Sequence, residues 1–173
     1  MADRSQGESA LVQFSERLTG SAAFGTLFRE GMDLVEETAA YLDGVGRTEA
    51  KALDRAVSLT YATESMRLTT RLMQLASWLL LHRAVKEGEM TLGQANREKT
   101  KVKLSAADPG PDAIIGKLPT ALQELIARSM ALQTKVRRLD TTIHAPTVER
   151  ASIGNPLVPQ LNRLKAAFER QGG

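Results

Sequence analysis

The chain has 173 residues, of which 42% are apolar, 25% are charged and 4% are aromatic, and none is cysteine. These proportions are typical of one folded domain and exclude a largely disordered chain; the lack of cysteine excludes a disulfide framework, a thiolate metal site and a cysteine nucleophile. Residues 1–90 carry 10 Lys and Arg against 13 Asp and Glu, whereas residues 91–173 carry 13 against 7, so the second half is better suited to an acidic partner.

Residues 1–20 begin with a polar sequence that lacks the apolar core of a signal peptide, so we expect an N-terminal extension of a cytoplasmic protein. The first predicted helix covers residues 21–44, with Ser21 as its N-cap and Gly44 just beyond its end. Gly31 lies on its apolar face, so we expect a neighbouring helix to approach the backbone there. That face recurs every third or fourth residue and comprises Phe24, Leu27, Gly31, Leu34, Thr38 and Tyr41.

The second predicted helix covers residues 48–87, a length of about 60 Å. Its polar side carries Glu64, Arg67 and Arg71, and the same line then reaches Trp78 and Leu81. Charged residues interrupt the apolar stretch around Trp78 well before the roughly 20 residues that a membrane span needs. Two neighbouring apolar rows predict the packing face: Leu59, Ala62, Met66, Thr69, Met73, Ala76 and Leu80 in the first, and Leu68, Leu72, Leu75 and Leu79 in the second.

Trp78 and Leu81 therefore need a cover on the far side of this helix. Either another segment of the chain, residues 91–104 or 155–170, folds over them, or a partner does, including a second copy. Tryptophan is frequent among the residues that dominate protein–protein interfaces. We therefore predict a contact end for a partner, formed by Trp78, Leu81, His82 and Val85.

The rest of the chain predicts a weak helix over residues 91–104, a loop rich in Pro and Gly over 105–117, and a third long helix from Pro119 to the residue before Pro146. A shorter amphipathic helix is expected over residues 155–171, and no strand pattern appears. We therefore expect an all-α fold, an antiparallel three-helix bundle over residues 21–145, followed by a C-terminal tail, residues 146–173, that contains the short helix.

The sequence offers little for catalysis or for binding a cofactor. The two histidines, His82 and His144, are more than sixty residues apart and neither has a companion at metal-binding spacing. Glu36 and Glu37 are adjacent on a helix and therefore point about 100° apart, unlike an acid–base pair. We expect no enzyme activity, no metal and no cofactor, and an interaction protein is the remaining interpretation.

A basic strip follows the second helix and has two alternative interpretations. On a helix its four residues form two pairs spaced by four, which could contact an acidic protein or the phosphates of a nucleic acid. No aromatic residue lies between them, so the stacking surface of a single-strand binder is missing and nucleic acid is the weaker alternative. The strip consists of Arg97, Lys99, Lys101 and Lys103.

Two long stretches of sequence resemble a known family. "LFREGMDLVEETAAYLDGVGR", residues 27–47, and "YATESMRLTTRLMQLASWLLLHRAVKEGEM", residues 61–90, resemble the RcdA family of alphaproteobacteria, regulators of CtrA degradation. The resemblance implies a cytoplasmic, dimerising helical bundle, concentrated at a cell pole, with a C-terminal tail that contributes to activity. It also implies a non-enzymatic adaptor that brings substrates or further adaptors to the ClpXP protease, primed by a CpdR-type response regulator, in cell-cycle-linked proteolysis.

Overall fold

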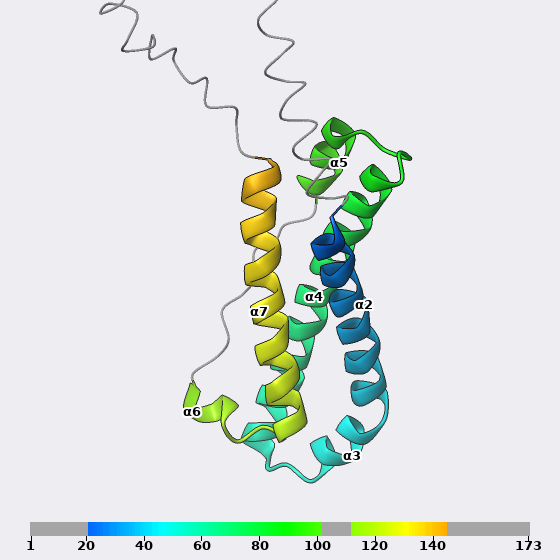
Figure 1. Cartoon of the computed structure of the whole chain (residues 1–173). Helices are drawn as coiled ribbons and strands as arrows, with labels where there is room; N and C mark the ends of the chain where they lie inside the picture. Colours follow the sequence, from blue (N-terminus) through cyan, green and yellow to red (C-terminus); the bar gives the residue numbers. More distant parts are fainter. Residues whose placement is uncertain (1–20, 102–111, 145–173) are drawn as a thin grey trace, which may run out of the picture.

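The computed structural model describes residues 21–101 and 112–144, which form helices and short connections between them (Figure 1). Three long helices form a bundle, so the prediction of an all-α bundle is confirmed. The predicted extension at 1–20 and the predicted C-terminal helix lie outside the described residues. The helices are α2 (Ala22–Asp43), α3 (Val45–Lys51), α4 (Arg55–Lys86), α5 (Leu92–Lys99), α6 (Asp112–Ile115) and α7 (Thr120–Ile143).

The ends of the first two long helices follow from local capping. The Ser21 hydroxyl accepts a hydrogen bond from the Phe24 N–H at 3.2 Å, and Gly44 ends α2 as predicted. The prediction of one continuous second helix is wrong near its start, because residues 52–54 separate α3 from α4. Asp54 causes the division: its carboxylate accepts from the Val57 N–H at 3.0 Å and caps a new helix. The 32 residues of α4 therefore span about 48 Å.

The direction of the helices differs from the expected antiparallel bundle. Arg71 of α4 contacts Ser129 of α7, and further along both helices Trp78 contacts Asp140, so α4 and α7 run parallel. Helix α2 is antiparallel to both, and its Glu30 pairs with Lys135 of α7. Helix α5 lies at one end of the bundle and α6 at the other, so α7 begins at the same end as α4 (Figure 1).

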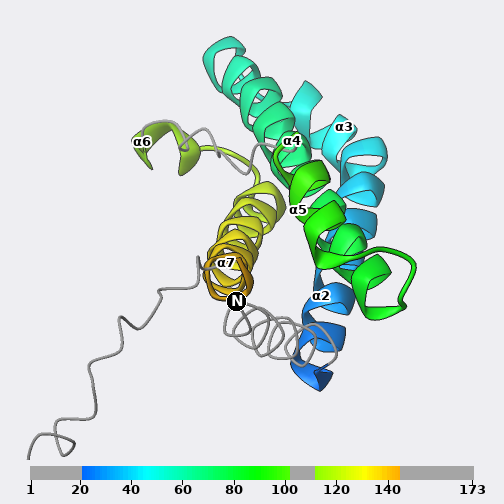
Figure 2. The same ribbon diagram turned by 90° about the horizontal axis from the view of Figure 1, so that it is seen from above.

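The core lies between the three long helices, and α5 covers the end of α4 (Figure 2). Leu34, Leu68, Leu79 and Leu132 are among its fully buried side chains. The expectation for Gly31 is confirmed, since a Cβ atom there would overlap the side chain of Leu79. Among the described helices, none has both the length and the apolar character that a membrane span requires.

The orientation of α4 is the main departure from the sequence-based prediction. Of the two apolar rows, Leu68, Leu72, Leu75 and Leu79 are buried as expected, but the row that begins at Leu59 faces outward. The side predicted to be polar and outward instead faces α7, and it buries Glu64, Arg71 and Trp78. Polar partners make this possible: Arg71 Nη1 donates to Ser129 Oγ at 2.8 Å, and Glu64 accepts from Arg67 at 2.6 Å.

Candidate functional site

Trp78 is buried by its own chain at the end of the bundle where α2, α4 and α7 meet. Its exposed fraction is 0%, and its ring lies 6.4 Å from the ring of Phe24 on α2. Its indole Nε1–H donates to Asp140 Oδ1 on α7 at 2.8 Å. The question of what covers Trp78 is thus answered in favour of the same chain, through α2 and α7.

His82 lies one turn after Trp78 on α4 and stacks on its indole ring. The ring centroids are 3.9 Å apart and the planes are inclined by 21°. His82 Nδ1 is 2.9 Å from the Trp78 carbonyl oxygen, which can only accept, so Nδ1 carries the proton. His82 Nε2 is therefore the free acceptor in the neutral ring, and it lies 3.0 Å from Nε2 of His144 at the end of α7.

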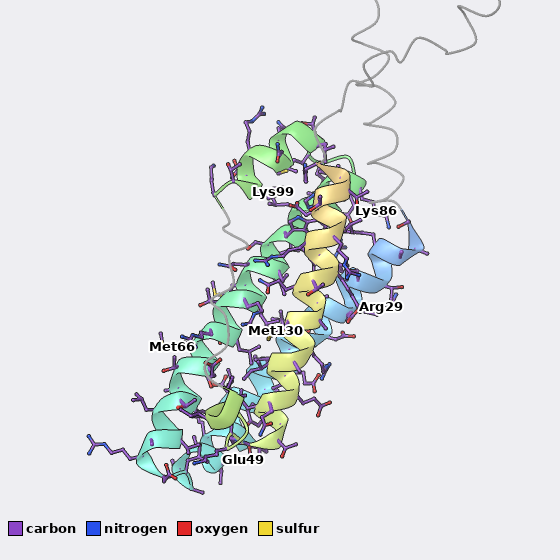
Figure 3. The ribbon with its side chains drawn as sticks, turned by 90° about the vertical axis from the view of Figure 1, so that its left-hand side faces the viewer. Arg29, Glu49, Met66, Lys86, Lys99 and Met130 are labelled. Atoms are coloured by element: carbon purple, nitrogen blue, oxygen red, sulfur yellow. The ribbon has the colours of Figure 1, made fainter. Side chains whose placement is uncertain are left out.

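Asp140 joins the third helix to this arrangement. Lys99 of α5 donates to both of its carboxylate oxygens at 2.9 Å, and His144 Nε2 lies 3.6 Å from Asp140 Oδ1. The Lys99 and Asp140 side chains are each only 18% exposed, so this ion pair is shielded from water. Figure 3 shows Lys99 on α5 beside the last turns of α7. We name the five residues Trp78, His82, Lys99, Asp140 and His144 the Trp78 cluster.

Burial controls the protonation of both histidines. Removal from water lowers the pKa of His82 to about 4, and the positive charges of a protonated His144 and of Lys99 act in the same direction. The hydrogen bond to the Trp78 carbonyl and the charge of Asp140 oppose this shift without cancelling it. Burial, followed by Lys99, also lowers the pKa of His144. Both rings are therefore neutral at pH 7.

The predicted contact end is only partly available to a partner. Trp78 and His82 are fully buried in the bundle as described, so they are not on its surface, and their contact with a partner stays a prediction. Leu81 and Val85 are half-buried at the surface, and their contact with a partner stays a prediction. Burial could not be read from the sequence because the covering residue, Asp140, lies 62 positions further along the chain.

Fewer cations of the predicted basic strip are exposed than the sequence suggested. Lys99 is held by Asp140, whereas Arg97 on α5 and Lys101, just after the end of α5, are exposed. Lys101 pairs with Glu98 at 2.8 Å. Lys103 lies outside the described residues. Two exposed cations therefore represent the strip in the described part of the chain, and their role towards an acidic partner stays a prediction.

Sequence reasoning missed an exposed apolar row on α4, which we name the α4 outer row. Its members are spaced by seven residues, so they lie along one side of the helix. Figure 3 shows Met66 on the side of α4 away from α7. The signal was present in the three-four rhythm, but that rhythm was assigned to the core. The row consists of Leu59, Met66, Met73 and Leu80, with exposed fractions of 71%, 72%, 66% and 53%.

Two shallow hollows flank the α4 outer row. The first lies between α2 and α4 next to Met73 and is lined mainly by apolar side chains that include Val35, Leu42 and Leu72. The second lies between α4 and α5 next to Leu80 and also includes Leu81. A row of large apolar side chains bordered by hollows is a surface into which the side chains of another protein can pack.

Comparisons with known proteins gave a family and a structure. A family model described as "Protein of unknown function (DUF1465)" matches residues 15–168. The crystal structure of RcdA from Caulobacter crescentus CB15 is similar to this chain at 50% sequence identity and a TM-score of 0.61, over 73% of this chain and 95% of that chain. No curated protein matched the chain.

Proposed function

The chain belongs to the RcdA family, and from this we propose that it is a non-enzymatic adaptor for the ClpXP protease. In this proposal it brings substrates or further adaptors to the protease in regulated, cell-cycle-linked proteolysis, together with a CpdR-type response regulator. The observation that carries the proposal is the 50% identity to RcdA across nearly all of that chain. The family's mode of action is therefore the best guide to this chain.

The α4 outer row supports a function based on protein contacts. Burial of a fully exposed large apolar side chain provides roughly 1.5–3 kcal/mol. The side chains of the α4 outer row are exposed over more than half of their surface, so each forgoes a large part of this free energy. Four such side chains in one line are more than scattered surface residues, and they suit a surface that is covered in an assembly.

We further propose that a second copy of the chain covers the α4 outer row. Leu59, Met66 and Met73 recur every seven residues, the repeat that keeps a seam facing a partner helix in a coiled coil. The intervening seam positions hold small residues, which permit close approach of the two helices: Ala62, Thr69 and Ala76.

Reconstituted proteolysis tests the adaptor function. Purified chain, ClpXP and the response regulator are combined with substrates captured from the host organism by a catalytically inactive, substrate-trapping protease. We expect the chain alone to degrade nothing and to accelerate turnover of particular captured substrates when all components are present. Equal turnover with and without the chain, for every captured substrate, would refute the proposal.

Sedimentation of single variants tests the second copy separately. Met66→Glu places a charge in the middle of the α4 outer row and should shift the protein to monomer with unchanged helix content. Ala127→Glu adds the same charge to an exposed position on α7 and serves as the matched control, which should remain dimeric. A wild-type monomer at high concentration would rule out the dimer while leaving the adaptor function open.

A further inference from the structure

The Trp78 cluster contains three metal-ligating side chains that the sequence holds far apart. One ligand atom each from His82, Asp140 and His144 can be chosen so that all three atoms lie within 4.8 Å of one another. His82 comes from α4 and Asp140 from the last turn of α7, while His144 is the C-cap of α7, four positions after Asp140, so the two lie on one side of its end. We propose that these three residues form a binding site for a divalent transition-metal ion, for which Zn²⁺ is the best match.

The spacing of the ligand atoms fits tetrahedral coordination of an ion after small side-chain movements. Zinc bonds of 2.0–2.1 Å in tetrahedral geometry place neighbouring ligand atoms about 3.3 Å apart. The two histidine Nε2 atoms are 3.0 Å apart, and His144 Nε2 is 3.6 Å from Asp140 Oδ1. Rotation of the Asp140 carboxylate towards His82 completes the third edge, and water takes the fourth position. Two imidazoles and a carboxylate suit Zn²⁺ and its first-row neighbours better than Mg²⁺ or Ca²⁺.

The surroundings already orient the first ligand. The Trp78 carbonyl holds the proton of His82 on Nδ1, so the lone pair of Nε2 points to the centre of the site. His144 donates its Nε2–H to that lone pair when no ion is bound. An ion entering between the rings requires His144 to carry its proton on Nδ1 instead, a tautomer change that releases no net proton.

Lys99 is the competing cation at this site. Its ammonium group bonds both oxygens of Asp140 at 2.9 Å, and the Trp78 indole also donates to Oδ1, so a bound ion would share Oδ1 with Trp78 while Lys99 keeps Oδ2. Such an outer partner orients a ligating carboxylate, but its positive charge also opposes the ion. The ion would connect α4 to α7 directly and α5 through Lys99, and would therefore stiffen this end of the bundle.

Titration of the chelator-treated full chain with Zn²⁺ alone tests the site. We expect one ion per chain and a rise in melting temperature on the order of 5 °C at a hundredfold excess over the dissociation constant. The single tryptophan gives a local readout, because its ring stacks on His82. Co²⁺ should quench its fluorescence and show the absorption of a tetrahedral complex. No binding, or an octahedral spectrum without quenching, would overturn the site.

Variants locate the ion. His144→Gln and Asp140→Asn should each weaken Zn²⁺ binding by at least about tenfold and abolish the quenching by Co²⁺. The matched control Glu124→Gln removes an exposed carboxylate from the same helix and should bind as the wild type does. Lys99→Met removes the competing charge and should tighten binding. Unchanged affinity in both ligand variants, or weaker binding in Lys99→Met, would overturn the assignment. If a variant fails to fold, the Co²⁺ spectrum of the wild-type chain decides whether the site exists.

Discussion

Acid should destabilise the bundle through His82, and the magnitude follows from its pKa. The pKa is about 4 in the folded chain and about 6.5 when unfolded, so only the unfolded state gains a proton between these values. Above pH 6.5 the ring is neutral in both states and stability is flat. As the pH falls from 6.5 to 4, the free energy of unfolding should drop by about 3 kcal/mol, since each unit of pKa difference corresponds to about 1.36 kcal/mol.

Urea unfolding with a chelator present, from pH 4 to 8, measures this loss. Carboxylates also contribute at the acid end, so the informative quantity is the difference between wild type and His82→Gln. That difference should be largest above pH 6.5 and should shrink by up to about 3 kcal/mol towards pH 4. Parallel stability curves for the two proteins across this range would refute the argument that burial keeps His82 neutral.

Four further substitutions test the packing by their effect on the free energy of unfolding in urea. Gly31→Ala should cost about 1–3 kcal/mol, because its Cβ meets the neighbouring helix, whereas Gly25→Ala, with nothing within 4 Å, should stabilise α2 by up to about 1 kcal/mol. Ser129→Ala removes the hydroxyl that accepts from the buried Arg71 and should cost about 1–3 kcal/mol. Trp78→Ala should cost about 3–5 kcal/mol because the ring is fully buried in the core, and an unchanged stability would contradict its burial.

The local parts of the fold could be predicted from the sequence because they depend on neighbours in the chain. The Ser21 cap needs only the N–H of Phe24 three residues away, and Gly44 ends α2 within the same turn. The division of the second predicted helix at Asp54 was not predicted, although its signal is equally local, because Asp is a common N-cap residue. It was overlooked because the apolar rhythm continues across Asp54.

The candidate sites depend on contacts that no local pattern specifies. His82 and His144 meet because α4 and α7 run parallel, a direction that the sequence of neither helix specifies. In an antiparallel pair the two rings would lie at opposite ends of the bundle. Asp140 precedes His144 by four positions, so the pair was a local signal for the cluster, but it was not recognised as a metal-binding spacing.

The orientation of α4 could not be chosen from its apolar pattern, because two of its sides are comparably apolar. The observed orientation is the opposite of the one expected from hydration of charged groups and burial of apolar ones: Glu64 and Arg71 are buried, while Met66 and Met73 are exposed. A buried charged group costs several kcal/mol before its partners compensate, and an exposed methionine forgoes roughly 1.5–3 kcal/mol. Rotating α4 to exchange these two sides would also expose Trp78, which lies on the same side as Glu64 and Arg71. The burial of Trp78 and the hydrogen bonds of Arg71 and Trp78 to α7 therefore hold α4 in this orientation, and the proposed cover of the α4 outer row would add to its stability.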